Sequence, residues 1–442
     1  MLKSIQIKNY KSIIDTTIDL EYGEAKAPNG YKAAERLPFL GYGVNGRIVP
    51  CLAVYGANAA GKSNLMEAVA LLKHLAADAG ATVATCYSPN KLTDMVLPTE
   101  FKVEYIQEEK QYTYRIAFNA DQVVNEELSD DEGHIFRITG EEVSFERLAK
   151  KDSVYNDDKF KEILSVECTS QGKQKTALLN KLINSYASLN KPIKDAGAFF
   201  LCELQFLATD TLLGIIPEAV KMLAKLQGDK ENAENLAMEE ILETVRQLDI
   251  DIRDISIVEQ KVSMQDLVKL DPRRHILKKQ IVNGERSMSI IDITTRHSDI
   301  NGQSVEFNFL REESEGTKKL VACVALFLLA VKLGRVVFID EMDRSLHPLL
   351  LKELLKFFTA RRYNVKKAQL VFTSHTTELL EDETLRISEI GILSKTLKTG
   401  TLLKRLSDIK KEEGTQRGIR NEYNHRLAYL DGYYSGVPFP SI

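Results

Sequence analysis

Short runs of alternating apolar and polar residues in the first third of the chain predict strands. Residues 1 to about 20 predict a first strand and its return. Glu100 to Phe118 predicts two strands joined at the polar turn Glu108–Lys110, and His134 to Phe145 continues the pattern. Gly23 to Gly46 contains glycine and proline and predicts a loop or hairpin. Together these runs predict an antiparallel subsheet.

Three runs of consecutive apolar residues predict strands of a different kind, buried on both faces as in a parallel sheet. They are Cys51 to Tyr55, Val336 to Ile339 and Gln369 to Thr373. A helix is predicted directly after the first run, over Ser63 to Lys73, and an apolar helix over Leu320 to Leu333. The two ends of the chain must therefore meet in one sheet.

The middle of the chain changes from helical to strand character. Between Lys159 and Leu248 apolar residues recur at helical spacing, most clearly over Thr176 to Leu189, Ile216 to Leu226 and Glu231 to Leu248. Strand patterns then return over Ile250 to Val262, Met288 to Thr295 and Ser304 to Leu310. The helical stripes indicate packing faces, and a sustained heptad repeat is missing.

Residues 56–63, with the sequence GANAAGKS, form a complete GxxxxGKS phosphate-binding loop, or P-loop, between a predicted strand and a predicted helix. Asn58 and Gly61 belong to the loop whose backbone N–H groups can surround a phosphate tail. Lys62 can neutralise the β and γ phosphates, and the Ser63 hydroxyl can hold Mg²⁺. The alternative is a chance match in an ordinary strand–turn–helix, but the flanking elements favour a nucleotide site.

An acidic pair, Asp340 and Glu341, ends the second apolar strand. Asp340 can coordinate Mg²⁺, and Glu341 can polarise a water for γ-phosphate hydrolysis. A helix beginning near Ser345 offers another reason for acidic residues here, although it explains Asp343 better than the pair. His375 follows the third strand and can act as a γ-phosphate sensor; a structural histidine is the alternative.

Ser314-Glu315-Gly316-Thr317 precedes the apolar helix and resembles the signature segment of ABC-type ATPases, particularly the head domains of the SMC and RecF-like group. The resemblance implies a shared site, in which Ser314 and Gly316 touch the γ-phosphate held by Lys62 of a second copy. It also implies that Met342 to Pro348 is the D-loop and that His375 is the switch histidine. Lys11, in the opening strand and turn, would approach the nucleotide.

Within that group the chain resembles the abortive-infection ATPases, namely the AbiLi and RloA-like proteins, with the ATPase subunit of the PARIS anti-phage system a near relation. The resemblance rests on DEMDRSLHP, TSHTTELL, Tyr429–Tyr433 and Gly436–Pro438, and does not cover roughly residues 145 to 300. The segment SEGT departs from the transporter signature, which argues against a membrane transporter motor. Gln122 and Glu126 are candidates for the Q-loop.

The resemblance implies an α/β P-loop NTPase head with a mixed parallel core sheet, an antiparallel subsheet and a largely helical insertion. We expect residues 1–145 to form the N-terminal lobe, 146–300 the insertion and 301–442 the C-terminal lobe. The implied cofactors are ATP and Mg²⁺. The implied partners are a second copy, forming a homodimer or larger homo-oligomer, and a separate effector, a nuclease or toxin.

Composition narrows these expectations only slightly. A net charge of −4 gives no overall attraction to nucleic acid or anionic membrane. Two local basic clusters, Arg273-Arg274 with Lys278-Lys279 and Arg361-Arg362 with Lys366-Lys367, indicate solvated faces or a nucleic-acid surface. Five scattered cysteines indicate a reduced, cytoplasmic protein. The longest apolar run, Leu320 to Val331, is too short to span a bilayer.

Two other function classes are open. A RecF-like ATPase of DNA maintenance would use a basic surface beside the closed dimer. An OLD-type nuclease would need a metal-binding domain after His375, where the sequence predicts only a short tail that ends in a charged run from Lys404 to Arg426, which we interpret as a solvated helix. We therefore expect nuclease activity, where it occurs, to come from a partner chain.

Overall fold

The computed structural model describes residues 1–22, 40–42, 46–93, 97–139, 142–145, 148, 155, 157–170, 173–186, 191–207, 209–228, 232–248, 250–263, 271, 273–282, 285–380, 384–412 and 424–434. The chain divides into two compact units. The first comprises Met1–Leu207, Leu333–Met342 and Phe358–Ile442, and the second Ala208–Lys332 and Asp343–Phe357. The predicted boundaries near residues 145 and 300 stay a prediction.

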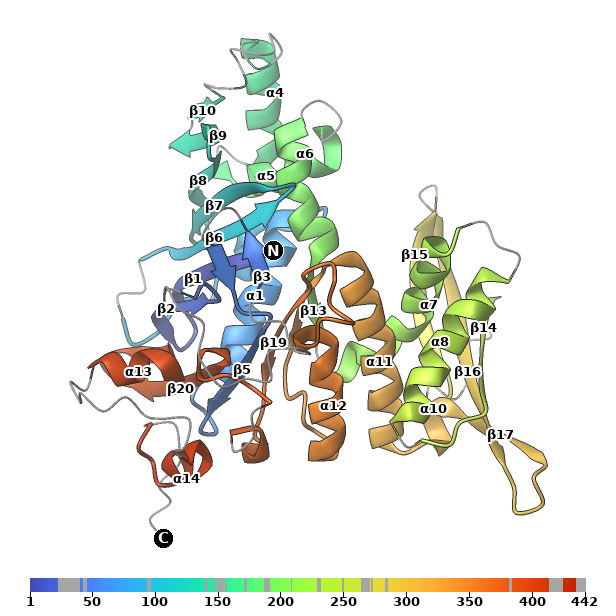
Figure 1. Ribbon diagram of the computed structural model, residues 1–442. Coiled ribbons are helices and arrows are strands. Elements are labelled where there is room, and N and C mark those ends of the chain that lie inside the picture. Colours follow the sequence, from blue (N-terminus) through green and yellow to red (C-terminus); the bar gives the residue numbers. More distant parts are fainter. Residues whose placement is uncertain are drawn as a thin grey trace. The chain divides into compact units, whose positions relative to one another are not determined.

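A thirteen-stranded mixed sheet runs through the first unit (Figure 1). Its parallel core has the order β20-β5-β19-β18-β13, with bounds Ile390–Thr396, Cys51–Gly56, Gln369–Thr373, Val336–Ile339 and Leu204–Leu207. The antiparallel part has the order β10-β9-β8-β7-β6-β1-β2-β21, with bounds Glu142–Ser144, Gly133–Thr139, Val123–Asp130, Lys110–Phe118, Thr99–Gln107, Leu2–Tyr10, Ile13–Asp19 and Gly400–Arg405. The predicted mixed α/β fold with an antiparallel subsheet is confirmed.

The segment after His375 is where the sequence-based prediction was wrong. Instead of a short tail, β20 and β21 form a hairpin that joins the parallel core to the antiparallel part, through β5 and β2. Of the predicted charged helix over 404–426, the structure describes the end of strand β21, then α13 (Leu406–Glu412) and the start of α14 (His425–Leu430), and residues 413–423 lie outside the described residues. These strands, with the sequences IGILSKT and GTLLKR, mix apolar with polar and charged residues, so local pattern alone did not reveal them.

Some predictions fall partly or wholly outside the described residues. Of the predicted loop or hairpin over residues 23–46, the structure describes β3 (Leu40–Tyr42), which pairs with β4 (Gly46–Ile48). Residues 23–39 and 43–45, and the segment Gly436–Pro438, lie outside the description.

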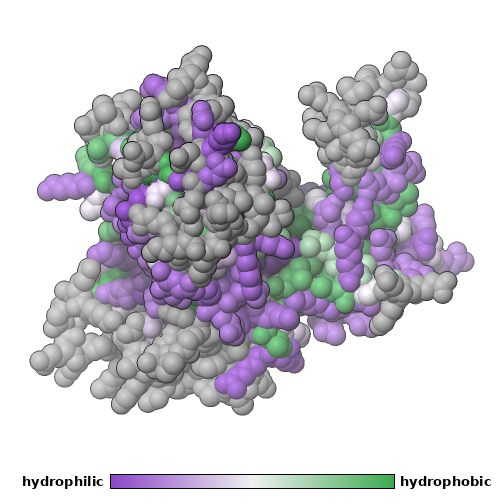
Figure 2. Space-filling model, turned by 90° about the horizontal axis from the view of Figure 1, so that it is seen from above, coloured by the Kyte–Doolittle hydropathy of each residue, from purple (hydrophilic) through white to green (hydrophobic). Residues whose placement is uncertain are grey.

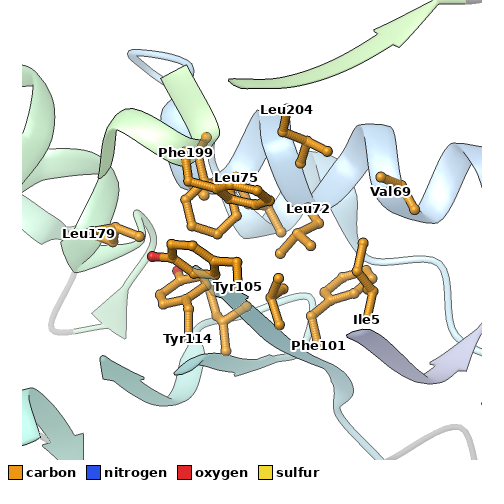
Figure 3. Packing of buried hydrophobic residues seen from close by; sticks show 14 of the residues in the cluster. Ile5, Val69, Leu72, Leu75, Phe101, Tyr105, Tyr114, Leu179, Phe199 and Leu204 are labelled. Atoms are coloured by element: carbon orange, nitrogen blue, oxygen red, sulfur yellow. The ribbon is translucent and has the colours of Figure 1, made fainter. Parts of the chain in front are cut away.

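Helix α1 (Lys62–Ala77) packs its apolar face on the sheet of the first unit. Figure 3 shows Val69, Leu72 and Leu75 of this helix directed toward residues of β1 and β6. The ring of Tyr105 stacks on Phe199 with centroids 4.3 Å apart. The other described helices of this unit are α2 (Val83–Cys86), α4 (Asp158–Cys168), α5 (Leu178–Lys181), the π-helix Leu182–Tyr186, α6 (Lys191–Ala198) and the π-helix Phe199–Glu203.

The second unit combines helices with a smaller antiparallel sheet. The sheet consists of β14 (Asp254–Val262), β15 (Ile276–Val282), β16 (Glu285–Ser298) and β17 (Ser304–Asn308), of which β15 was not predicted. The helices are α7 (Ile215–Leu226), α8 (Ala233–Gln247), α10 (Phe309–Glu312), α11 (Glu315–Leu333) and α12 (Pro348–Thr359), the last two extending to the unit boundary. The predicted helices over 216–226 and 231–248 correspond to α7 and α8.

Within the described residues, none of the helices combines the length and apolar character needed to cross a bilayer. The apolar run of α11 is buried over residues 318–331. Figure 2 shows one face of the molecule, on which most of the coloured surface is hydrophilic.

Candidate functional site

The P-loop connects β5 to α1, and its backbone requires glycine. Gly61 has φ = +105°, a conformation that side-chain-bearing residues rarely adopt. A Cβ at this position would lie 2.3 Å from Thr401 Oγ1 and 2.8 Å from Ser12 Oγ. A Cβ at Gly56 would lie 2.7 Å from the Leu393 carbonyl oxygen. The loop therefore keeps its shape only because these two positions have no side chain.

The chemistry that a phosphate site needs is present at the start of α1. Lys62 is only 8% exposed, and its Nζ donates to the carbonyl oxygens of Gly56 (2.7 Å) and Ala57 (3.2 Å), so the ammonium lies over the loop. The first turn of α1 contains no acidic residue, and no side chain caps its N-terminal amides. Ser63 and Asn58 are exposed beside these amides. The residues present thus fit an anionic triphosphate.

The acidic pair follows β18 and is held by a residue of the neighbouring strand. The Thr373 hydroxyl donates to Asp340 Oδ1 at 2.5 Å and accepts from the Glu341 backbone N–H at 2.7 Å. Glu341 has φ = +48°, the left-handed region that is unfavourable for most side-chain-bearing residues. Such backbone strain is typical of functional positions. Thr373 was not identified from the sequence as a site residue; its place at the end of an apolar strand was the available signal.

The parallel order β5-β19-β18 brings three motifs to one edge of the sheet. The carboxyl ends of these strands lead into the P-loop, into His375 and into the acidic pair, respectively. His375 is exposed, two residues after β19. This edge is the usual ligand-binding edge of a parallel sheet.

Lys11 lies in the β1–β2 turn beside α1, where it pairs with Glu67. Its backbone N–H donates to the Ser88 carbonyl oxygen at 2.8 Å. The next residue, Ser12, accepts from Asn64 Nδ2 at 2.7 Å. The turn forms one wall of a cavity of about 500 Å³, lined among others by Asn90, Lys91 and Lys395. This cavity adjoins the first turn of α1 and offers room for the remainder of a nucleotide.

The signature-like segment, Ser314 to Thr317, lies in the second unit. Ser314 is exposed, and its Oγ caps α11 by accepting from the Thr317 backbone N–H at 3.0 Å. A Cβ on Gly316 would lie 2.8 Å from the Ser345 carbonyl oxygen, so glycine is required there. The preceding Glu313 accepts from Thr295 Oγ1 (2.5 Å) and is paired with His297 Nε2 (2.6 Å) of β16.

Glu126 is not a suitable Q-loop residue. It is completely buried, and its carboxylate accepts from the backbone N–H groups of Leu178 (2.6 Å) and Leu179 (2.9 Å) and from the Tyr114 hydroxyl (3.0 Å). Its side chain is therefore used to fasten α5 to β8. Gln122 precedes β8 and is partly exposed, without a described link to the P-loop.

The buried Glu126 should make stability depend on pH. Burial raises its pKa from 4.5 to about 7, against the opposing effect of its hydrogen bonds. The folded state therefore holds the proton more tightly, so this contribution is complete below about pH 4.5 and is lost as the pH rises through about 7. The loss should be on the order of 3 kcal/mol at most. Between pH 5 and 8 the melting temperature of Glu126→Gln should depend less on pH than that of the unmodified protein, whereas the exposed control Glu132→Gln should behave like the unmodified protein. Equal pH dependence in all three proteins would contradict this assignment.

Comparisons with known proteins agree with these motifs. Residues 51–198 and 231–381, more than half of the chain, match the AAA_21 family, described as "AAA domain, putative AbiEii toxin, Type IV TA system". An SMC head domain from Thermotoga maritima aligns with 91% of this chain and 98% of that chain, at 10% identity and a TM-score of 0.39. A search of curated proteins found no match. The matched residues include the P-loop, strand β18 with the acidic pair, and strand β19 with His375. The chain therefore belongs to this AAA family of P-loop ATPases.

Proposed function

We propose that the protein binds ATP with Mg²⁺ and hydrolyses it at the edge formed by β5, β19 and β18. The observation that supports this most strongly is the Thr373 hydroxyl, which bridges Asp340 and Glu341. Thr373 ends β19, the strand that lies between β18 and the P-loop strand β5. A bridge of this kind holds the metal-binding carboxylate of Asp340 and the backbone from which the water-activating carboxylate of Glu341 projects, and phosphoryl transfer to water needs both groups in place. Phosphate release from ATP, measured with Mg²⁺ and with EDTA, tests the proposal.

Each residue has a distinct role in this reaction. Lys62 and the amides that begin α1 bind the phosphate tail, while Ser63 and Asp340 provide oxygen ligands for the metal. Mg²⁺, when bound, supplies neutralisation of the developing negative charge. Glu341 orients and polarises the attacking water, and His375 contacts the γ-phosphate. Asn58 and Lys11 border the nucleotide, with Lys11 facing the cavity beside α1.

We further propose that two copies close over each nucleotide, so that Ser314 and Gly316 of one copy meet the phosphate held by Lys62 of the other. The exposed Ser314 hydroxyl at the start of the nineteen-residue helix α11 supports this, because an exposed hydroxyl beside a helix N-terminus can donate to a phosphate oxygen. The resemblance to ABC-type heads points the same way. Oligomerisation would thus be part of the catalytic cycle.

Ser314→Arg should separate binding from closure. The added bulk and charge should leave ATP binding by one copy within about two-fold, while preventing the closed pair and reducing turnover by roughly 100-fold. Sizing with a non-hydrolysable ATP analogue should show dimers for the unmodified protein and for the control Asn301→Arg, an exposed turn residue. Dimers formed equally well by Ser314→Arg would exclude this arrangement.

We propose that the nucleotide state controls a separate effector, a nuclease or toxin, in abortive-infection defence against phage. The family description, which names a toxin–antitoxin system, and the resemblance to AbiLi and RloA-like ATPases support this role. Affinity purification with and without ATP should recover an effector in a nucleotide-dependent manner. Identical co-purifying proteins in both conditions would contradict the regulatory role.

A RecF-like role on DNA is the second candidate. Arg361, Arg362, Lys366 and Lys367 are all exposed in the short connection between α12 and β19. A phosphate-binding surface here predicts ATPase stimulation by duplex DNA that falls steeply with salt. Absence of stimulation at low salt would favour the effector-control function.

A further inference from the structure

Helix α14 lies against the entrance of the P-loop. The ring of Tyr429 meets the ring of Tyr55 edge-on, with centroids 5.9 Å apart and an interplanar angle of 64°. Burial raises the pKa of the Tyr429 hydroxyl, and the Gly56 backbone opposes this effect. Tyr55 directly precedes Gly56, the first P-loop residue, whose carbonyl accepts from Lys62 Nζ. Helix α14 therefore packs on the strand residue that leads into the P-loop.

The same helix also holds the segment that carries His375. Arg426 Nε donates to Thr377 Oγ1 at 3.0 Å, two residues beyond the histidine. Tyr55, which is completely buried, donates its hydroxyl to the Thr376 carbonyl oxygen at 3.1 Å. The segment is therefore held by the strand that leads into the P-loop and by α14.

Helix α14 has the internal contacts of a defined element. Asn424 caps its first turn by accepting from the Leu427 backbone N–H at 2.9 Å. His425 Nδ1 lies 3.0 Å from the Tyr434 hydroxyl, and both side chains are buried. Because these contacts fix the conformation of the helix, its side chains can hold the residues that they contact in place.

We propose that α14 forms a wall of the ATP site and that Arg426 and Tyr429 are positioning residues, acting through Thr377 and Tyr55, respectively. The inference rests on the proposed ATP hydrolysis. His375 is exposed on a short segment, so its placement depends on what holds the residues beside it. A displacement of about 1 Å at a reacting group can cost about 100-fold in rate, whereas the phosphate tail remains bound by Lys62 and the α1 amides. Loss of these contacts should therefore reduce kcat more than it raises KM.

A double-mutant cycle on Arg426 and Thr377 tests this route. Arg426→Ala and Thr377→Val should each lower kcat by about 10-fold, with KM within about two-fold, and the double variant should be no slower than the slower single variant. Arg426→Lys should recover part of the loss, because its ammonium can still donate to the Thr377 hydroxyl. Leu427→Ala, at a position that is 56% exposed on the same helix, should match the unmodified protein.

The outcomes distinguish this inference from the proposed function. If the unmodified protein releases no phosphate from ATP, the proposed hydrolysis fails and the inference fails with it. If the unmodified protein is active and Arg426→Ala is equally active, only the inference is overturned. Losses that multiply to about 100-fold in the double variant would show that the two residues act independently, which also overturns it.

Hydrogen exchange on the unmodified protein gives a test that does not depend on the folding of variants. Addition of Mg²⁺ and a non-hydrolysable ATP analogue should slow amide exchange over residues 425–432 at least about two-fold, together with the P-loop. The strand β17, in the second unit, provides an internal reference. Protection of the P-loop with unchanged exchange in α14 would overturn the inference while leaving nucleotide binding established.

Discussion

Lys62→Ala should abolish measurable ATP binding. The Lys62 ammonium is the buried positive charge at the P-loop, and removing one member of a buried charge pair costs about 2–5 kcal/mol, or roughly 30-fold to several thousand-fold in affinity. Titration with a fluorescent ATP analogue should show this loss for Lys62→Ala and none for Lys225→Ala, an exposed lysine of α7. Unchanged affinity would remove the P-loop from the nucleotide site.

The fold must be checked in the same preparation. Lys62 Nζ also donates to the Gly56 and Ala57 carbonyl oxygens, so alanine leaves these two acceptors without that donor. A cost of about 1–3 kcal/mol in stability follows. A thermal unfolding curve that stays cooperative at the assay temperature shows that weak binding reflects the missing charge and not unfolding.

Glu341→Gln should separate ATP binding from hydrolysis. Glutamine is nearly the same size as glutamate and would adopt the same backbone φ of +48°. The change therefore removes mainly the negative charge that polarises the water. The Thr373 bridge to the backbone N–H is retained. We expect affinity within about two-fold, turnover lower by about 100-fold or more, and an accumulation of closed assemblies with ATP.

Two measurements decide the role of Glu341. Phosphate release gives the turnover, and sizing after incubation with ATP and Mg²⁺ gives the assembly. Glu353→Gln, a surface position on α12 that pairs with Lys356, is the matched control. Normal turnover in Glu341→Gln would exclude this carboxylate as the general base and would leave the acidic pair with a metal-binding or structural role.

Local sequence was sufficient for the parts of the site whose chemistry and secondary structure agree over a few residues. Strands β18 and β19 begin and end where the sequence predicted, since strands buried on both faces carry largely apolar sequence. The P-loop was predictable because its backbone conformation requires glycine, as the positive φ of Gly61 shows. The acidic pair follows directly from the end of β18.

Other elements were beyond a local pattern. The strands of the hairpin β20–β21 mix apolar with polar and charged residues, so they become clear only through pairing with β5 and β2. Glu126 shows the converse: it was a candidate for the Q-loop, but tertiary packing buried it against α5. Burial of one particular carboxylate depends on segments distant in the chain.

The sequence by itself determined the P-loop, the acidic strand end, the histidine after the next strand and the mixed α/β character, because each depends on residues that are neighbours along the chain. Only the tertiary structure decided that Thr373 bridges Asp340 and Glu341 and that Tyr429 of α14 packs on Tyr55. Thr401, which packs on Gly61 and donates to Ser12 across 389 positions, illustrates the reason. Such contacts depend on how the completed sheet brings strands together, and no periodicity within one segment encodes that arrangement.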